Sequence, residues 1–253
     1  MLLNVDNIGI SFGGLKAVQA LSLRVPKGAL YGLIGPNGAG KTTSFNLLTG
    51  VYQAQTGSIQ LDGHELIGKR PFEIAAAGLS RTFQNIRLFP DLSVLDNVRL
   101  AMHMRGKQRL WRTALRTRGF REQERRMETR GRELLAIFDL ADKADAYARN
   151  LPYGDQRRLE ILRALATEPK VLLLDEPAAG MNPAEKVALA DSIDRIRAEF
   201  GLTVLLIEHD MTLVMDVCER ITVLDYGQVI AEGTPGEIQA NPRVIEAYLG
   251  TTD

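Results

Sequence analysis

The sequence has very few of the residues that build disulfide frameworks and metal sites. Its 253 residues include one cysteine, Cys218, so no disulfide can form within the chain and no thiolate cluster can hold a metal ion. The three histidines, His64, His103 and His209, are far apart and show no ligand spacing. These shortages exclude a disulfide framework and argue against a zinc site.

Long apolar runs and a targeting signal are also missing. The longest apolar runs, such as TVLLI, are far shorter than the ~20 residues that a bilayer-spanning helix needs. The N-terminal stretch MLLNVDNIGI lacks a charged start followed by a long apolar run, so we expect no signal peptide. We therefore expect a cytosolic protein, which something else must hold at a membrane if it works there.

The chain has no excess of charge of either sign. It carries 31 Lys and Arg residues against 31 Asp and Glu residues, so its bulk electrostatics do not indicate a nucleic-acid partner, and we expect none. The block 105–132 is locally basic, with eleven Lys or Arg against three Glu. Its aromatic residues are Trp111 and Phe120, which make a poor stacking surface for bases. A solvated helical face and a surface near anionic lipid headgroups are both compatible with this block.

Strand and helix patterns alternate through most of the chain. Short apolar runs such as VLLLD and TVLLI, bounded by turn residues, are typical of buried strands. Asn182 and Thr234 each precede a proline and, three residues on, a glutamate, which predicts two capped helix starts. We predict an α/β domain spanning residues 1–253, with a core of residues 1–88 and 151–253. Residues 89–150 contain helix formers and charges without a convincing strand, which predicts an inserted helical subdomain.

A glycine-rich segment, GLIGPNGAGKTT, follows an apolar strand and precedes a helical stretch. Gly35 to Thr42 match the pattern G-x-x-x-x-G-K-[ST], in which glycines let the backbone curl and turn its N–H groups toward phosphates. We expect Lys41 to reach the β and γ phosphates and the Thr42 hydroxyl to coordinate Mg²⁺. The candidate nucleotide contacts are Gly35, Pro36, Asn37, Gly38, Ala39, Gly40, Lys41, Thr42 and Thr43. This loop does not distinguish kinases, GTPases, helicases and transport ATPases.

Two adjacent carboxylates end the apolar run VLLLDEP. We expect the strand end to put Asp175 next to the phosphate loop, where it can hold Mg²⁺ through water. Glu176 would then face the attacking water as its general base. A strand that merely ends in acidic residues is the alternative.

With these motifs the chain resembles the ATP-binding subunit of an ABC transporter, over nearly its whole length from Leu3 to Gly250. The resemblance implies ATP and Mg²⁺ as cofactors, and a fold with a mixed sheet core, an N-terminal antiparallel β subdomain and an inserted α-helical subdomain. It implies adenine stacking for Phe12, sensing of Mg²⁺ and the γ-phosphate for Gln84, and a switch role for His209. With Lys41 and Glu176, Gln84 and His209 form the candidate catalytic set. The candidate metal ligands are Thr42, Gln84 and Asp175. Each of Phe12, Gln84 and His209 would be an ordinary residue in isolation, and their order and spacing carry the assignment.

The segment LPYGDQ, residues 151–156, falls where this family carries its signature, which contacts the ATP held by a partner subunit. Pro152 and Tyr153 stand where the family usually has serine and glycine, and Pro152 offers neither a hydroxyl nor an N–H. The candidate contacts are Tyr153, Gly154, Asp155 and Gln156. Asp155 would bring a negative charge near a triphosphate unless it points away or caps the helix. We expect ordered, partner-dependent binding, and an amphipathic helix without a nucleotide role is the alternative.

Four segments together look like the larger ATPase subunit of branched-chain amino-acid importers: RTFQNIRLFPDLSVLDNV, YGDQRRLEI, LDEPAAGMNP and PRVIEAYLG. The resemblance implies ATP hydrolysis that powers such an importer, at the cytoplasmic face of the cell membrane as a peripheral subunit. The implied partners are transmembrane permease subunits, a second ATPase subunit of the same or another kind, and an external substrate-binding protein acting through the permease.

Importers of urea or amides share most of these sequence features. An ABC ATPase acting on DNA is a further alternative, but the stretch between Lys41 and Leu151 is too short for the long coiled coil of that class.

Overall fold

The computed structural model describes residues 1–103 and 118–249, so the part of the basic block from Arg105 to Arg116 lies outside the described residues. The chain divides into two compact units. The first contains residues 1–84 and 170–253, and the second contains residues 85–169. Among the residues that the structure describes, no helix is both long enough and apolar enough to cross a membrane.

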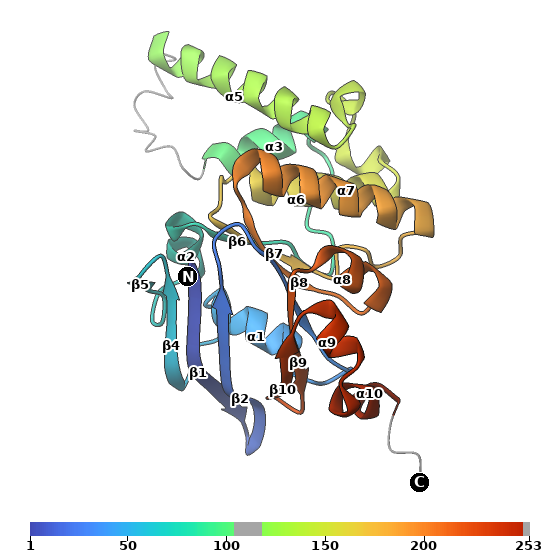
Figure 1. The fold of residues 1–253 in the computed structure, drawn as a ribbon. Coiled ribbons are helices and arrows are strands. Elements are labelled where there is room, and N and C mark those ends of the chain that lie inside the picture. The colour runs from blue at the N-terminus through green and yellow to red at the C-terminus, as the bar shows by residue number, and fades with distance from the viewer. Residues whose placement is uncertain (104–117, 250–253) are drawn as a thin grey trace. The chain divides into compact units, whose positions relative to one another are not determined.

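The first unit contains two sheets and the helices that pack on them (Figure 1). Its strands are β1 (Leu3–Phe12), β2 (Leu15–Val25), β3 (Leu30–Ile34), β4 (Thr56–Leu61), β5 (His64–Glu65), β6 (Leu79–Arg81), β7 (Val171–Asp175), β8 (Thr203–Ile207), β9 (Arg220–Asp225) and β10 (Gln228–Gly233). Its helices are α1 (Lys41–Leu48), α2 (Pro71–Ala77), α7 (Pro183–Phe200), α8 (Met211–Val217), α9 (Pro235–Gln239) and α10 (Pro242–Leu249).

The two sheets confirm the predicted mixed core and N-terminal antiparallel sheet. The antiparallel sheet has the order β2-β1-β4-β5. The second sheet has the order β10-β9-β3-β8-β7-β6, in which all neighbours are parallel except β9 and β10. The strands β3, β7 and β8 are buried along their whole length, which is why they appear as continuous apolar runs.

Helix α1 lies between the two sheets, where its apolar side packs into the core of the first unit (Figure 1). Phe45 and Leu48 of α1 are fully buried in one cluster with side chains from β1, β2, β3, β7 and β8. Burying a side chain of that size contributes about 1.5–3 kcal/mol relative to leaving it exposed. This packing fixes the start of α1, and with it the end of the phosphate loop.

Both predicted helix caps are confirmed. The Asn182 side chain accepts a hydrogen bond of 3.0 Å from the Glu185 N–H, and Glu185 Oε2 accepts one of 2.8 Å from the Asn182 N–H. The same reciprocal pair joins Thr234 and Glu237 at the start of α9. Each pair satisfies N–H groups that the first turn of a helix leaves without a partner.

The second unit is helical. It contains α3 (Val94–His103), α5 (Arg118–Ile137), the 3₁₀ turns η1 (Ala141–Lys143) and η2 (Ala148–Asn150), and α6 (Tyr153–Leu165). A Cβ at Gly131 of α5 would lie 2.7 Å from Leu95 Cδ1 of α3, so glycine permits the close approach of these helices. Asn97, fully buried in α3, binds the backbone N–H and carbonyl of Phe89, which fixes the segment leading into the unit.

Candidate active site

The phosphate loop joins β3 to α1 through backbone conformations that favour glycine. Gly35 has a φ of 152°, and a Cβ there would lie 2.1 Å from the Leu224 carbonyl oxygen of the neighbouring strand β9. Gly40 has a φ of 101° and is the N-cap of α1. A Cβ at Gly40 would lie 2.6 Å from the Ala17 carbonyl oxygen of β2. The glycines of the motif are therefore required by close backbone approaches as well as by the curl of the loop.

Lys41 bends back over the loop that precedes it. Its ammonium group donates hydrogen bonds of 2.7 Å to the Gly35 carbonyl and 2.9 Å to the Pro36 carbonyl, and only 6% of the residue is exposed. Burial lowers the pKa of Lys41, while the nearby carboxylates of Glu176 and Asp175 oppose that shift. The lysine is thus held across the loop by acceptors that an incoming anion can replace.

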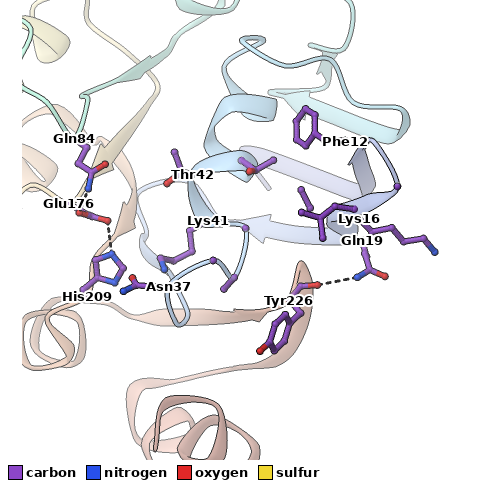
Figure 2. A pocket seen from close by; sticks show the side chains of 17 residues that line it. Phe12, Lys16, Gln19, Asn37, Lys41, Thr42, Gln84, Glu176, His209 and Tyr226 are labelled. Carbon is purple, nitrogen blue, oxygen red and sulfur yellow. Dashed lines mark hydrogen bonds and ion pairs between the residues drawn. The ribbon is translucent and has the colours of Figure 1, made fainter. Parts of the chain in front are cut away.

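The phosphate loop borders a cavity of about 670 Å³ in the first unit (Figure 2). Its lining brings together the sequence-predicted residues Phe12, Asn37, Gly38, Ala39, Gly40, Lys41, Thr42, Thr43, Gln84, Glu176 and His209. Gly35, Pro36 and Asp175 are not among the residues that line the cavity. Figure 2 shows Gln84, Glu176 and His209 on one side of Lys41, and Phe12 on the other.

Phe12 stands at the end of β1, where the chain turns into β2. The residue is 44% exposed, and its ring meets the Tyr52 ring edge-on, with 5.2 Å between the ring centroids. Phe12 lines the cavity, and the Tyr52 contact supports its ring there. Such a half-exposed ring beside a phosphate loop has the chemistry needed to stack on a base.

The cavity also has lining residues that the sequence reasoning did not identify: Gly14, Leu15, Lys16, Ala17, Gln19 and Tyr226. Tyr226 belongs to the turn between β9 and β10, and its carbonyl accepts a 3.0 Å hydrogen bond from Gln19 Nε2. The Gly227 N–H next to it donates to the Ala39 carbonyl of the phosphate loop over 2.9 Å. No local pattern in the sequence points to Tyr226, whereas its neighbours 14–19 could have been found from their place directly after Phe12.

Glu176 lies between two other predicted residues. Its Oε1 is 2.6 Å from His209 Nε2, and its Oε2 accepts a 2.8 Å hydrogen bond from Gln84 Nε2 (Figure 2). Glu176 has a φ of 49°, a left-handed conformation that costs a non-glycine residue about 1–3 kcal/mol. Its N–H is held by the Ile207 carbonyl at 2.8 Å, so the backbone after β7 keeps the carboxylate aimed at the cavity. The three side chains offer a carboxylate base with two orienting partners.

Asp175, one residue earlier, is buried and paired with a cation that the sequence reasoning missed. Arg81, at the end of β6, donates to Asp175 Oδ2 over 2.6 Å and to the Asn46 side-chain oxygen of α1 over 2.7 Å. The side chains of Arg81 and Asp175 are 7% and 3% exposed. The guanidinium also lies near the faces of two phenylalanine rings, at 5.5 Å from Phe45 and 5.3 Å from Phe83. Asp175 is therefore a fixed carboxylate, linked through Arg81 to the helix that follows the phosphate loop.

Replacing Arg81 by methionine is expected to lower the free energy of unfolding by about 3–5 kcal/mol, because it leaves Asp175 as a buried charge without its partner. Denaturant unfolding followed by circular dichroism measures this change. Arg70→Met is the matched control. The ion pair between Arg70 and Glu73 is exposed to solvent, so Arg70→Met should hardly change the denaturant concentration at which half of the protein is unfolded. Equal stabilities of the two variants would contradict the structural role given to Arg81.

The predicted signature lies in the second unit, at the start of α6. Pro152 is the N-cap, and Tyr153 follows it with its side chain 47% exposed. The carboxylate of Asp155 is held inside this unit, 2.6 Å from Lys143 Nζ and 3.6 Å from Arg158 Nη1. Its negative charge is thus largely balanced within the second unit, which resolves the unfavourable charge considered from the sequence. Pro152 provides no side-chain cap for α6, so the N–H groups of its first turn are available to an external acceptor.

The available donors fit a hydrated Mg²⁺ ion. The Thr42 hydroxyl and the Gln84 amide line the cavity, and Asp175 supplies a carboxylate at the adjoining strand end. Mg²⁺ prefers such oxygen ligands, retains several of its waters and is commonly completed by phosphate oxygens. A single carboxylate and a hydroxyl beside a phosphate loop match that preference.

Comparisons with known proteins agree with this arrangement. A family model described as ABC transporter matches residues 18–179, and one described as branched-chain amino acid ATP-binding cassette transporter matches residues 228–253. The chain is 45% identical to the high-affinity branched-chain amino acid transport ATP-binding protein BraF of Pseudomonas aeruginosa, with 98% of both chains covered. It is 46% identical to LivG of Salmonella typhimurium, which has the same description, over the same share of both chains. The solved ADP conformation of MJ1267, an ATP-binding cassette of an ABC transporter, superposes with a TM-score of 0.84 at 30% identity, covering 99% of each chain.

Proposed function

The chain belongs to the ABC transporter family of ATP-binding proteins and is an ATPase of that family, and from this premise we propose that it powers an importer of branched-chain amino acids. The observation that carries the catalytic part is the arrangement of Glu176 between Gln84 and His209 in the cavity that the phosphate loop borders. The substrate is proposed from relatives named as branched-chain amino acid transport proteins, which match nearly the whole chain.

The phosphates of ATP are bound by backbone N–H groups of residues 35–43, of which Pro36 has none, and by the N-terminal end of α1. On binding, Lys41 exchanges its contacts with the Gly35 and Pro36 carbonyls for the β and γ phosphates. Phe12 stacks on the adenine at the other end of the cavity. Thr42, Gln84 and Asp175 would hold Mg²⁺, which would neutralise charge on the phosphate oxygens.

Glu176 is the general base in this proposal. Its carboxylate accepts a proton from the water that attacks the γ-phosphate. His209 and Gln84 bind one carboxylate oxygen each, which limits the positions that Glu176 can take. Gln84 thus binds the base and is also one of the residues that would hold the metal ion, which supports its role as a sensor of bound nucleotide.

The residues 151–156 act on a second ATPase subunit. The first turn of α6 presents free N–H groups at Tyr153 and Gly154, and these bind the γ-phosphate held by the partner. Because Asp155 is already paired with Lys143, its charge opposes this contact less than an unpaired carboxylate would. The partner is a second copy of this chain or a related ATPase.

The remaining partners are transmembrane permease subunits and an external substrate-binding protein that acts through them. In this proposal the chain works as a peripheral subunit at the cytoplasmic face of the cell membrane. The family model at residues 228–253 and the names of the relatives support branched-chain amino acids over urea or amides as the substrate. No observation in the described residues favours action on DNA.

Reconstitution tests this function directly. The chain is coexpressed with the permease subunits of its own genome, and the purified complex is placed in proteoliposomes. We expect ATP hydrolysis that rises when binding protein loaded with leucine, isoleucine or valine is added outside, and no such rise with urea. If hydrolysis rises with urea instead, the chain serves an importer of urea or amides. Failure to copurify any permease, with hydrolysis stimulated by DNA, would contradict the proposal.

A further inference from the structure

A second glutamate, Glu208, precedes the cavity residue His209 in the chain and has no part in the mechanism described so far. It follows the last residue of β8 and is only 3% exposed. Its Oε1 accepts a 2.7 Å hydrogen bond from the Ala178 N–H. Its Oε2 accepts hydrogen bonds from the His209 N–H at 3.0 Å and the Asp210 N–H at 3.4 Å. One buried carboxylate thus joins two loops that come from different strands.

Each of those loops carries a member of the catalytic group. Ala178 follows Glu176 by two positions, in the segment between β7 and α7. His209 is bound through its own backbone N–H, and Asp210 next to it is the N-cap of α8. The side chains of Glu176 and His209 meet at 2.6 Å on the cavity side. The two loops are therefore joined twice. Glu208 binds the backbone N–H groups of both, and the side chains of Glu176 and His209 bind each other.

The three backbone N–H donors around Glu208 indicate that this connection needs a carboxylate. Burial raises the pKa of Glu208, whereas the three backbone N–H groups that it accepts from oppose that shift. An amide of nearly the same shape has one acceptor oxygen and one NH₂ donor group. Glutamine would therefore turn a donor toward either Ala178 or the His209–Asp210 pair, and at least one backbone N–H group would lose its acceptor.

We propose that Glu208 is a positioning residue for ATP hydrolysis: by binding both loops, it holds the His209 imidazole against the Glu176 carboxylate. The inference rests on the proposed roles of Glu176 and His209. Glu208 does not touch the nucleotide in this scheme, because it is buried and is not among the residues that line the cavity. Its loss affects turnover through the position of His209 and leaves ATP binding by the phosphate loop intact.

The test is a double-mutant cycle in the assembled transporter, with Glu208→Gln, His209→Ala and the double variant. Glu208→Gln is expected to lower kcat by about 10- to 100-fold, the size expected when a catalytic group is misplaced by about 1 Å. The KM for ATP should stay within about twofold. Because Glu208 acts through His209, adding Glu208→Gln to His209→Ala should lower kcat by less than about threefold more.

Two further variants separate positioning from a general loss of structure. Glu208→Asp keeps the buried charge but is too short to reach all three N–H groups, so it should show the same fall in kcat at unchanged KM. Glu185→Gln makes the same chemical change in the helix cap of α7, where one acceptor suffices, and should hydrolyse ATP at the wild-type rate. Thermal unfolding midpoints are recorded for every variant.

The outcomes distinguish this inference from the proposed function. The wild-type rate and its dependence on loaded binding protein test the function alone. With a normal wild-type rate, an unchanged kcat in Glu208→Gln overturns the inference. The inference is also overturned if the fall in kcat of the double variant equals the product of the falls in Glu208→Gln and His209→Ala. Glu208 would then act independently of His209.

Discussion

Replacing Glu176 by glutamine is expected to slow ATP hydrolysis by about 10²–10⁴-fold, the usual contribution of a general base. Glutamine keeps the size of the side chain and can still accept a hydrogen bond, so the contacts at His209 and Gln84 are largely retained. What it loses is the carboxylate that takes the proton from the attacking water. ATP binding does not require that proton transfer, and the variant should accumulate as an ATP-bound dimer.

Single-turnover hydrolysis in the assembled transporter measures the chemical step for Glu176→Gln without interference from product release. Titration calorimetry gives the ATP affinity, and size-exclusion chromatography with ATP detects the trapped dimer. Glu185→Gln serves as the control, since it is the same substitution outside the cavity. If Glu176→Gln turns over ATP at the wild-type rate, Glu176 is not the base.

Gly154→Asp is expected to abolish ATP-dependent dimerisation and hydrolysis while leaving the ATP affinity of the isolated subunit nearly normal. The substitution puts a side chain and a negative charge at the first turn of α6, where we propose that the γ-phosphate bound by the partner approaches. Lys143 and Arg158 are already engaged by Asp155, so this new charge lacks the neutralisation that Asp155 has. Steric hindrance and Coulomb repulsion then both oppose closure of the dimer.

Lys41→Ala provides the contrast to Gly154→Asp, because the contacts of Lys41 are made within one chain. It should lose ATP affinity already in the isolated subunit. Calorimetry on both isolated variants and ATPase assays on both variant complexes compare the two.

Gly154 is buried, so the unfolding midpoint of Gly154→Asp is measured first. Tyr153→Asp places the same charge at an exposed neighbouring residue. Normal hydrolysis by folded Gly154→Asp and Tyr153→Asp complexes would mean that residues 151–156 are simply the start of a helix.

Short-range features of the fold were predictable from the sequence. The phosphate loop follows from glycines at fixed spacing, and the starts of α7 and α9 follow from Asn182 and Thr234 with their glutamates. The buried strands β3, β7 and β8 follow from continuous apolar runs. Each of these depends on residues within a few positions of one another, so a local pattern contains all the information needed.

The composition of the site was only partly predictable. Phe12, Gln84 and His209 were identified from their order along the chain and Glu176 from its place at a strand end, and the structure brings all four to one cavity. Tyr226 lines the same cavity without any signal in its neighbourhood. It arrives there because the Gln19 backbone N–H donates to the Gly227 carbonyl over 2.7 Å, which joins the β9–β10 turn to β2. A contact between segments so distant in sequence produces no residue pattern in either segment, so it could not be predicted from the sequence.

The sequence alone therefore established the chemistry that the chain carries, and the tertiary structure decided which charges are paired. From sequence, Asp155, Asp175 and Glu208 are three acidic residues at or beside element ends. In the structure Asp155 pairs with Lys143, Asp175 pairs with Arg81, and Glu208 binds the backbone N–H groups of two loops. Parallel strands bring their carboxyl ends to the same edge of a sheet whatever their separation in the chain. Burial there removes water as an alternative partner, so each carboxylate must be satisfied by the donors that the fold happens to bring within reach.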